Sequence, residues 1–363
     1  MSRWQQAFFL LLQAGLWEKI SADLSLFPLS AEEWQKVYDE SRRQTVQGLL
    51  YRGFQLLPEH FFPPQSVLFL WLTDISVIED NNRQMQRAIA SSQRLLSQAG
   101  MEGVLQKGVT AARLYEHPEL RSCGDVDWYV VPREGSWESL PSFLQEKGYE
   151  PLIAADGSIF FTCEGVEIEL HRRLIDIQNP RKRSLLARLS DDGSLTTLAL
   201  TDSLSVKTPQ PLPTMTMFMA HMMKHALTVG IGLRQFCDMA RAYHVWHGHY
   251  DTTLLTDSYR RLGMQKWSMS VHGLLVDFLG LPPAELPAPL PDRHYGRQLL
   301  ERVMLWGNFG QHTRQWPGHP SKQYTVRQII SNLPLSMRYA PVEAFYKIKG
   351  LVKGQGKIKK LKD

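Results

Sequence analysis

Two aspartates separated by one residue, Asp125 and Asp127, lie in the stretch SCGDVDWYVV. The apolar residues between and after them, Val126, Trp128 and Val130, predict a strand that enters the core. Successive side chains of a strand point to opposite faces, so residues two apart share a face. We therefore expect both aspartates on one face and the apolar residues on the other. Two carboxylates this close repel each other unless a cation joins them, and Mg²⁺ is a natural candidate for such oxygen ligands.

A second acidic strand is predicted further along the chain. The stretch SIFFTCEGVEIELHRRL reads as a hairpin that turns at Glu164-Gly165, and its second strand carries Glu167, Glu169 and His171 on one side. A third carboxylate is then available beside the aspartate pair. Three carboxylates on adjacent strands suit two-metal phosphoryl transfer, in which ions about 4 Å apart clamp a triphosphate, activate a hydroxyl and neutralise the leaving pyrophosphate.

The aspartate pair also has a purely structural interpretation. Asp125 would end a turn, and Asp127 would form an ion pair with an arginine such as Arg121 or Arg172. An isolated Asp-x-Asp pattern does not decide between this interpretation and a metal site.

The residues around the aspartates form an ordered set of motifs. These are a Leu-x-Lys-Gly turn (Leu105 to Gly108), a Tyr-x-x-Pro-x-x-Arg segment (Tyr115 to Arg121), Gly-Asp-x-Asp (Gly124 to Asp127) and a carboxylate-Leu-His element (Glu169 to His171). With this set the sequence resembles the polymerase-beta-like nucleotidyltransferase superfamily, and within it a family of uncharacterised bacterial nucleotidyltransferases. The resemblance covers, in pieces, roughly residues 96–245.

The resemblance implies roles for the three carboxylates. Asp125, Asp127 and Glu169 would be both the metal ligands and the catalytic residues, with Glu169 nearest the attacking hydroxyl as its base or as a ligand of the catalytic ion. Spacing alone does not choose between Glu167 and Glu169, but the following Leu-His favours Glu169. The implied cofactors are two Mg²⁺ ions, with Mn²⁺ as the alternative, and an NTP co-substrate for which ATP is the first choice.

Further residues are expected to bind the nucleotide. A glycine in the turn would let backbone N–H groups approach the phosphates. The superfamily normally has Gly-Ser there, so the lysine of this turn either replaces the serine as a cation or is a solvated strand end. Arginine forks suit phosphate oxygens, and a lysine on a later helix either reaches the nucleotide or belongs to a packed helix face. The expected nucleotide-binding residues are Lys107, Gly108, Arg121, His171, Arg172 and Lys224.

Composition restricts the class of protein. The 363-residue chain has three widely spaced cysteines, which argues against a disulfide framework or a zinc knuckle and favours the cytoplasm. We expect neither a signal peptide nor stable membrane insertion, since no window reaches the roughly 18 apolar residues that span a bilayer. The net charge of +5 is concentrated in a tail of seven lysines and one aspartate, residues 347–363. This basic tail either contacts nucleic acid or an anionic surface, or is simply solvated.

Periodicity predicts the organisation of the chain. Helical patterns fill residues 1–99, with a capping box at Ser30 and Glu33, and return over residues 208–346. Strand and short-helix patterns lie between them, in residues 100–207. We therefore predict an α+β fold in which a small mixed-sheet nucleotidyltransferase core is flanked by N-terminal and C-terminal helical regions, with the basic tail at the end.

The functional expectation is a Mg²⁺-dependent nucleotidyltransferase. It would move a nucleoside monophosphate from an NTP to a hydroxyl-bearing acceptor, which could be a small molecule, a sugar, a protein side chain or an RNA end, with release of pyrophosphate. The alternative is a catalytically silent nucleotide-sensing or scaffolding protein that keeps the same fold. Three aligned acids favour catalysis, while the altered turn weakly favours the alternative.

Overall fold

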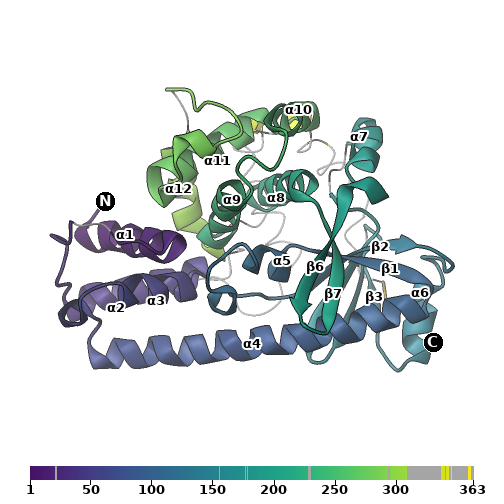
Figure 1. The fold of residues 1–363 in the computed structure, drawn as a ribbon, viewed down its shortest axis with the longest axis horizontal. Helices are drawn as coiled ribbons and strands as arrows, with labels where there is room; N and C mark the ends of the chain where they lie inside the picture. Colours follow the sequence, from purple (N-terminus) through teal and green to yellow (C-terminus); the bar gives the residue numbers. More distant parts are fainter. Residues whose placement is uncertain are drawn as a thin grey trace. The chain divides into compact units, whose positions relative to one another are not determined.

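A computed structural model describes residues 1–20, 23–154, 156–175, 177, 179–227, 230–292 and 295–308, and beyond these only 337–339, 341, 342, 345, 359 and 360. The chain forms two compact units, each assembled from separate stretches of sequence. One, here called the helical unit, comprises Met1–Asp80, Ala112–Ser122 and His221–Tyr339. The other, the sheet unit, comprises Asn81–Ala111, Cys123–Ala220 and Ala340–Asp363. The predicted α+β class, a mixed sheet flanked by helical regions, is confirmed (Figure 1).

The sheet unit is built on one mixed eight-stranded sheet with the order β6-β7-β1-β2-β5-β4-β3-β8. Strand β1 pairs antiparallel with β2, which in turn pairs parallel with β5. The strands are β1 (Met101–Gln106), β2 (Val126–Pro132), β3 (Leu152–Ile153), β4 (Ile159–Cys163), β5 (Val166–His171), β6 (Leu195–Thr201), β7 (Leu204–Pro209) and β8 (Lys359–Lys360). The basic tail predicted at residues 347–363 otherwise lies outside the described residues.

The helical unit contains the predicted N-terminal and C-terminal helices. They are α1 (Arg3–Trp17), α2 (Ala31–Gln44), α3 (Gln47–Gln55), α9 (Leu233–Val245), α10 (Thr252–Leu262), α11 (Gln265–Leu279) and α12 (Gly296–Trp306). Helix α4 (Gln65–Gln98) begins in this unit and ends in the sheet unit, and α8 (Pro211–Ala226) does the reverse. The capping box of α2 is confirmed, because the Glu33 N–H donates to Ser30 Oγ and the Ser30 N–H to Glu33 Oε2.

The apolar face of β2 anchors the sheet on the second half of α4. Val126, Trp128 and Val130 are at most 2% exposed, as their alternation predicts. The Trp128 indole N–H donates to Ser92 Oγ of α4 at 3.0 Å, so the largest of these side chains also has its polar atom satisfied. This packing fixes the direction in which the other face of β2 points.

The predicted hairpin is confirmed as β4 and β5. Its turn residues Glu164 and Gly165 have φ of 53° and 75°, the pair of positive values that a two-residue hairpin turn of type I′ requires. From α4, Gln84 Nε2 donates to the Glu164 carbonyl at 2.7 Å, and Ser91 Oγ to its carboxylate at 2.9 Å. The hairpin that carries Glu169 is therefore fixed on the same helix as β2.

One strand boundary differs from the sequence prediction: β2 begins at Val126, so Asp125 lies just before the strand. Strand β1 ends at Gln106. It ends there because the backbone of Lys107 has a φ of 47°, which is left-handed and ends the extended conformation. Gly108 then starts the short helix α5 (Gly108–Ala112).

We predict that Gly103→Ala destabilises the protein by about 1–3 kcal/mol. A Cβ at Gly103 would lie 2.7 Å from Trp128 Cε3 and 2.8 Å from Leu96 Cδ1, inside the contact between β2 and α4. Gly124→Ala is the matched control, because a Cβ at Gly124 has no described atom within 4 Å. Urea unfolding of both variants checks this, and equal losses of stability would contradict the packing described.

Candidate functional site

The polar residues of three neighbouring strands meet on one face of the sheet. Asp127 of β2 lies opposite Gln106 of β1 and opposite Glu169 of β5. Residues directly opposite each other across paired strands project to the same face. His171, two residues after Glu169, projects to that face as well.

Asp127 is the centre of this arrangement. Its side chain is 3% exposed, and its Oδ1 lies 2.9 Å from Lys107 Nζ and 2.9 Å from His171 Nε2. Burial alone would raise the pKa of Asp127, but Lys107 and His171 outweigh it and hold this pKa well below its ordinary value. The carboxylate is therefore ionised at neutral pH, in contact with two nitrogen partners.

Glu169 has the opposite electrostatic character. Its Oε1 lies 3.5 Å from His171 Nε2. Burial is the main cause that raises the pKa of Glu169 to about 7, and the negative charge of Asp127 adds to it. A carboxyl group that titrates near neutrality is suited to accept a proton in a reaction at physiological pH.

The side chains of Asp127, Glu169 and His171 offer a donor set for a divalent cation. One ligand atom from each lies within 4.8 Å of the others. Two carboxylates and an imidazole suit Mg²⁺ or Mn²⁺ through oxygen and also transition metals through nitrogen. Ser158 Oγ lies 3.3 Å from the other ring nitrogen of His171, which is the kind of outer contact that orients a histidine ligand.

Asp125 and the turn at Lys107 and Gly108 lie next to this group. Asp125 is not among the three residues with mutually close ligand atoms. Burial alone would lower the pKa of Lys107, but the charges of Asp127, Glu169 and Asp125 outweigh burial and raise it. A Cβ at Gly108 would lie 3.3 Å from the Asp125 carbonyl oxygen, so the turn passes close to the segment that precedes β2.

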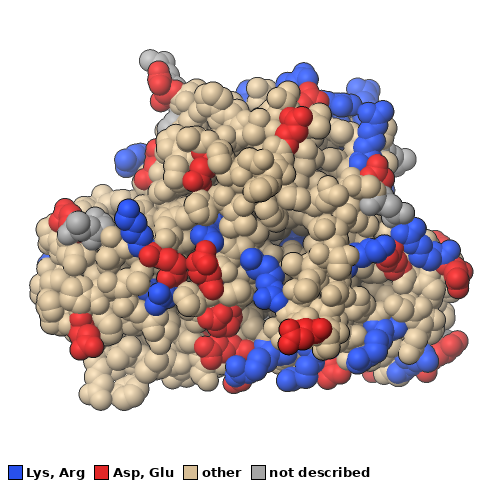
Figure 2. All heavy atoms as spheres, viewed as in Figure 1, with Lys and Arg blue, Asp and Glu red and all other residues tan. Residues whose placement is uncertain are grey.

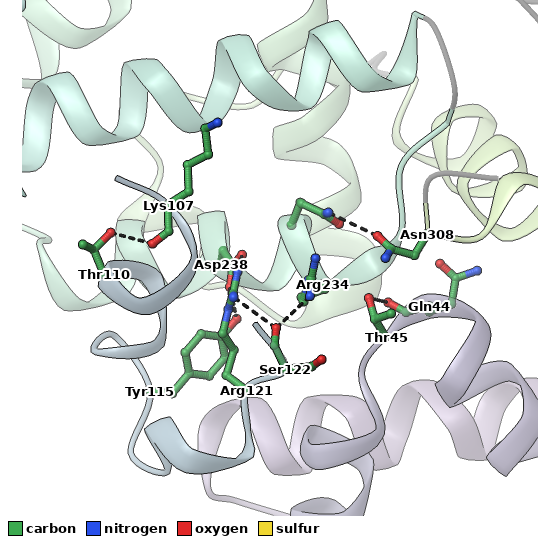
Figure 3. Close-up of polar contacts among 11 residues, drawn as sticks. Gln44, Thr45, Lys107, Thr110, Tyr115, Arg121, Ser122, Arg234, Asp238 and Asn308 are labelled. Atoms are coloured by element: carbon green, nitrogen blue, oxygen red, sulfur yellow. Dashed lines mark hydrogen bonds and ion pairs between the residues drawn. The ribbon is translucent and has the colours of Figure 1, made fainter. Parts of the chain in front are cut away.

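Arg121 has a buried partner in the helical unit. Its Nε and Nη2 donate to the two carboxylate oxygens of Asp238 at 3.1 and 2.6 Å, and the Tyr115 hydroxyl donates to the same carboxylate at 2.8 Å (Figure 3). Nearby, Arg234 donates to the Ser122 carbonyl at 2.7 Å. The two ends of the Tyr-x-x-Pro-x-x-Arg motif thus meet on one aspartate, which gives this motif a structural role.

The other expected nucleotide-binding residues have separate surroundings. Arg172 donates to Glu138 at 2.9 Å, and its guanidinium carbon lies 4.9 Å from the centre of the Trp137 ring. Lys224 lies on α8, in the part that belongs to the helical unit. Asp127 thus has Lys107 and His171 as partners where the structural interpretation expected Arg121 or Arg172. The nucleotide-binding roles of Arg121, Arg172 and Lys224 stay predictions.

Two residues at the site were not predicted from the sequence. Ser158 lies before β4, and no spacing links it to His171. Gln106 is 2% exposed, and its amide nitrogen has no hydrogen-bond partner in the part of the chain that the structure describes. Its position next to Lys107 is the one sequence signal that could have drawn attention to it.

Comparison with known proteins places the chain in a family. Residues 30–280 match the model described as an uncharacterised nucleotidyltransferase, and the chain belongs to that family. Among solved structures, the chain is similar to an antigenic nucleotidyltransferase-like protein from Paracoccidioides brasiliensis, with 13% identity, a TM-score of 0.35, and coverage of 55% of this chain and 93% of that chain. This likeness is too distant to support an argument. No curated protein matches the chain significantly.

We predict that Glu169→Gln stabilises the metal-free protein at pH 8 by about 3 kcal/mol and leaves its stability nearly unchanged near pH 4.5. The pKa of Glu169 rises from 4.5 to about 7 on folding, so its favourable contribution is complete below pH 4.5 and is lost as the pH rises through 7. Glutamine mimics the protonated form at every pH.

Denaturant unfolding in EDTA at both pH values measures this difference. Glu167→Gln is the control, because Glu167 is exposed on the same strand. A stabilisation by Glu169→Gln that is the same at both pH values would contradict the electrostatic explanation.

Proposed function

We propose that the protein is a Mg²⁺-dependent nucleotidyltransferase that moves a nucleoside monophosphate from an NTP, with ATP as the first choice, to a hydroxyl-bearing acceptor. The observation that carries this proposal is the group formed by Asp127, Glu169 and His171, whose ligand atoms lie within 4.8 Å of one another. Family membership supports the reaction class. The acceptor classes stay those named from the sequence: a small molecule, a sugar, a protein side chain or an RNA end.

Divalent ions supply the charge neutralisation that the reaction needs. Asp127, Glu169 and His171 would hold one ion, with Asp125 as the further carboxylate for the second ion that the sequence predicts. Mn²⁺ is the alternative to Mg²⁺, because imidazole and carboxylate ligands both suit it. When bound, the ions polarise the phosphates and stabilise the charge on the leaving pyrophosphate.

Residues of the chain would transfer the proton and bind the phosphates. Glu169 accepts the proton of the acceptor hydroxyl as a general base. The hydroxyl oxygen forms a bond to the α-phosphorus, and the bond from this phosphorus to the β-phosphate oxygen breaks. Lys107 provides a positive charge for the phosphates, and Gly108 lets the backbone come close to them.

The cellular setting is part of the same proposal. The cysteines Cys123, Cys163 and Cys237 are all buried, and none of them forms a disulfide within the described residues, which fits a reducing cytoplasm. None of the helices within the described residues is both long and apolar enough to cross a membrane. On the face shown in Figure 2, acidic and basic side chains are interspersed.

We predict that label from an α-³²P NTP is transferred to an acceptor in cell extract by the wild-type protein, and that Asp127→Asn reduces transfer by more than about 100-fold. Loss of even one hydrogen-bonded partner of a metal ligand typically lowers metal affinity or activity 10–100-fold. The four NTPs are tested separately with Mg²⁺ and with Mn²⁺, and the protein, RNA and small-molecule fractions are counted.

Glu167→Gln is the matched control and should transfer label as the wild type does. Transfer that persists in Asp127→Asn would contradict the site. Binding of an NTP without transfer in any fraction would favour the silent nucleotide-sensing alternative.

A further inference from the structure

Lys107 has a backbone conformation that few non-glycine residues adopt. Its φ is 47°, and its carbonyl accepts hydrogen bonds from the Ala111 N–H at 2.9 Å and from Thr110 Oγ1 at 2.7 Å (Figure 3). A left-handed residue of this kind persists when its surroundings determine it, and such residues gather at functional sites. Here the first turn of α5 fixes the carbonyl of Lys107, and the side chain extends to Asp127.

The Lys107 ammonium occupies a place where a metal ion would be expected. It lies 2.9 Å from Asp127 Oδ1, the oxygen that also contacts His171 Nε2. The Lys107 side chain is 19% exposed and the Asp127 side chain 3%, so this ion pair is largely removed from water. Breaking such a pair without a replacement cation would leave an uncompensated buried charge.

We propose that Lys107 is a resident cation of the site, which a divalent ion displaces from Asp127 and which then becomes free to bind the triphosphate. This inference rests on the proposed function for the identity of the ion and of the anionic ligand. A divalent ion on Asp127, Glu169 and His171 would meet the ammonium at the same oxygen, where like charges repel at short range. The ammonium therefore exchanges one anionic partner, a carboxylate, for another, a phosphate.

Two opposite consequences for binding follow. The ammonium competes with the metal ion when no nucleotide is present, so the metal alone should bind weakly to the wild type. Nucleotide removes the competitor by engaging it, so metal and nucleotide should each strengthen the binding of the other. A lysine that merely held the turn in place would produce neither effect.

Lys107→Met tests this directly, with Mn²⁺ alone as the probe and free Mn²⁺ measured by electron paramagnetic resonance. We expect the variant to bind Mn²⁺ about 10-fold more tightly than the wild type, and to bind Mg²⁺-ATP about 10-fold more weakly. Lys107→Arg keeps the positive charge and should not gain Mn²⁺ affinity. Lys147→Met is the matched control, because Lys147 is an exposed lysine of the sheet unit.

The stability of the variant provides a second readout. If Lys107→Met is unfolded without metal, Mn²⁺ should restore its fold, and its melting temperature should rise with Mn²⁺ more than that of the wild type. A Mn²⁺ affinity equal to or weaker than that of the wild type, or a melting temperature that Mn²⁺ does not raise, would overturn the proposal.

The outcomes also separate this inference from the proposed function. Label transfer by the wild type together with unchanged Mn²⁺ affinity in Lys107→Met would overturn the resident cation and leave the transferase standing. Tighter Mn²⁺ binding in Lys107→Met without label transfer by the wild type would support the resident cation and contradict the transferase.

Discussion

The site depends on one buried carboxylate that must have positive partners. Asp127 is almost completely removed from water, and an ionised carboxylate in such a place is tolerated only when it is paired and hydrogen-bonded. Lys107, in the turn after β1, and His171, at the end of β5, meet this need from the two sides of β2. The positions of the turn after β1, of β2 and of the end of β5 are thus tied together at a single oxygen atom.

The order of the strands gives this face two different sides. Gln106 and Lys107, at the end of β1, supply hydrogen-bond donors, while Glu169 on β5 supplies an acid that is partly protonated at neutral pH. Under the proposed function, an anionic triphosphate would suit the first side and an acceptor hydroxyl the second. The buried amide nitrogen of Gln106, which has no hydrogen-bond partner among the described residues, fits this division, since buried donors are normally satisfied and a phosphate oxygen would satisfy it.

The segment between the turn after β1 and the start of β2 belongs to the helical unit. The chain leaves the sheet unit after Ala111 and returns at Cys123, and the residues between them are fixed in the helical unit by contacts such as the ion pair between Arg121 and Asp238. The turn that carries Lys107 is therefore linked covalently, through α5, to a segment of the helical unit. This explains why a motif that appeared to be part of the site contains residues with structural partners.

Much of the sheet that positions the site could be predicted from the sequence. Alternation placed Val126, Trp128 and Val130 in the core, and the hairpin that turns at Glu164-Gly165 put Glu169 on a strand beside the aspartate pair. Strands β6 and β7 were not predicted, because polar residues such as Thr196 and Thr197 weaken their apolar pattern. The partners of Asp127 could not be predicted either. They depend on the left-handed backbone of Lys107 and on the register between β2 and β5, and no fixed spacing in the sequence indicates either feature.

We infer that the face around Asp127 is a cation site in which Lys107 and a metal ion exclude each other. Anomalous diffraction from crystals grown with Mn²⁺ and a non-hydrolysable ATP analogue tests this exclusion. We expect an anomalous peak coordinated by Asp127 and Glu169, with the Lys107 ammonium moved from Asp127 to a phosphate oxygen. A crystal with bound nucleotide but no peak at this position, and with Lys107 still on Asp127, would contradict it.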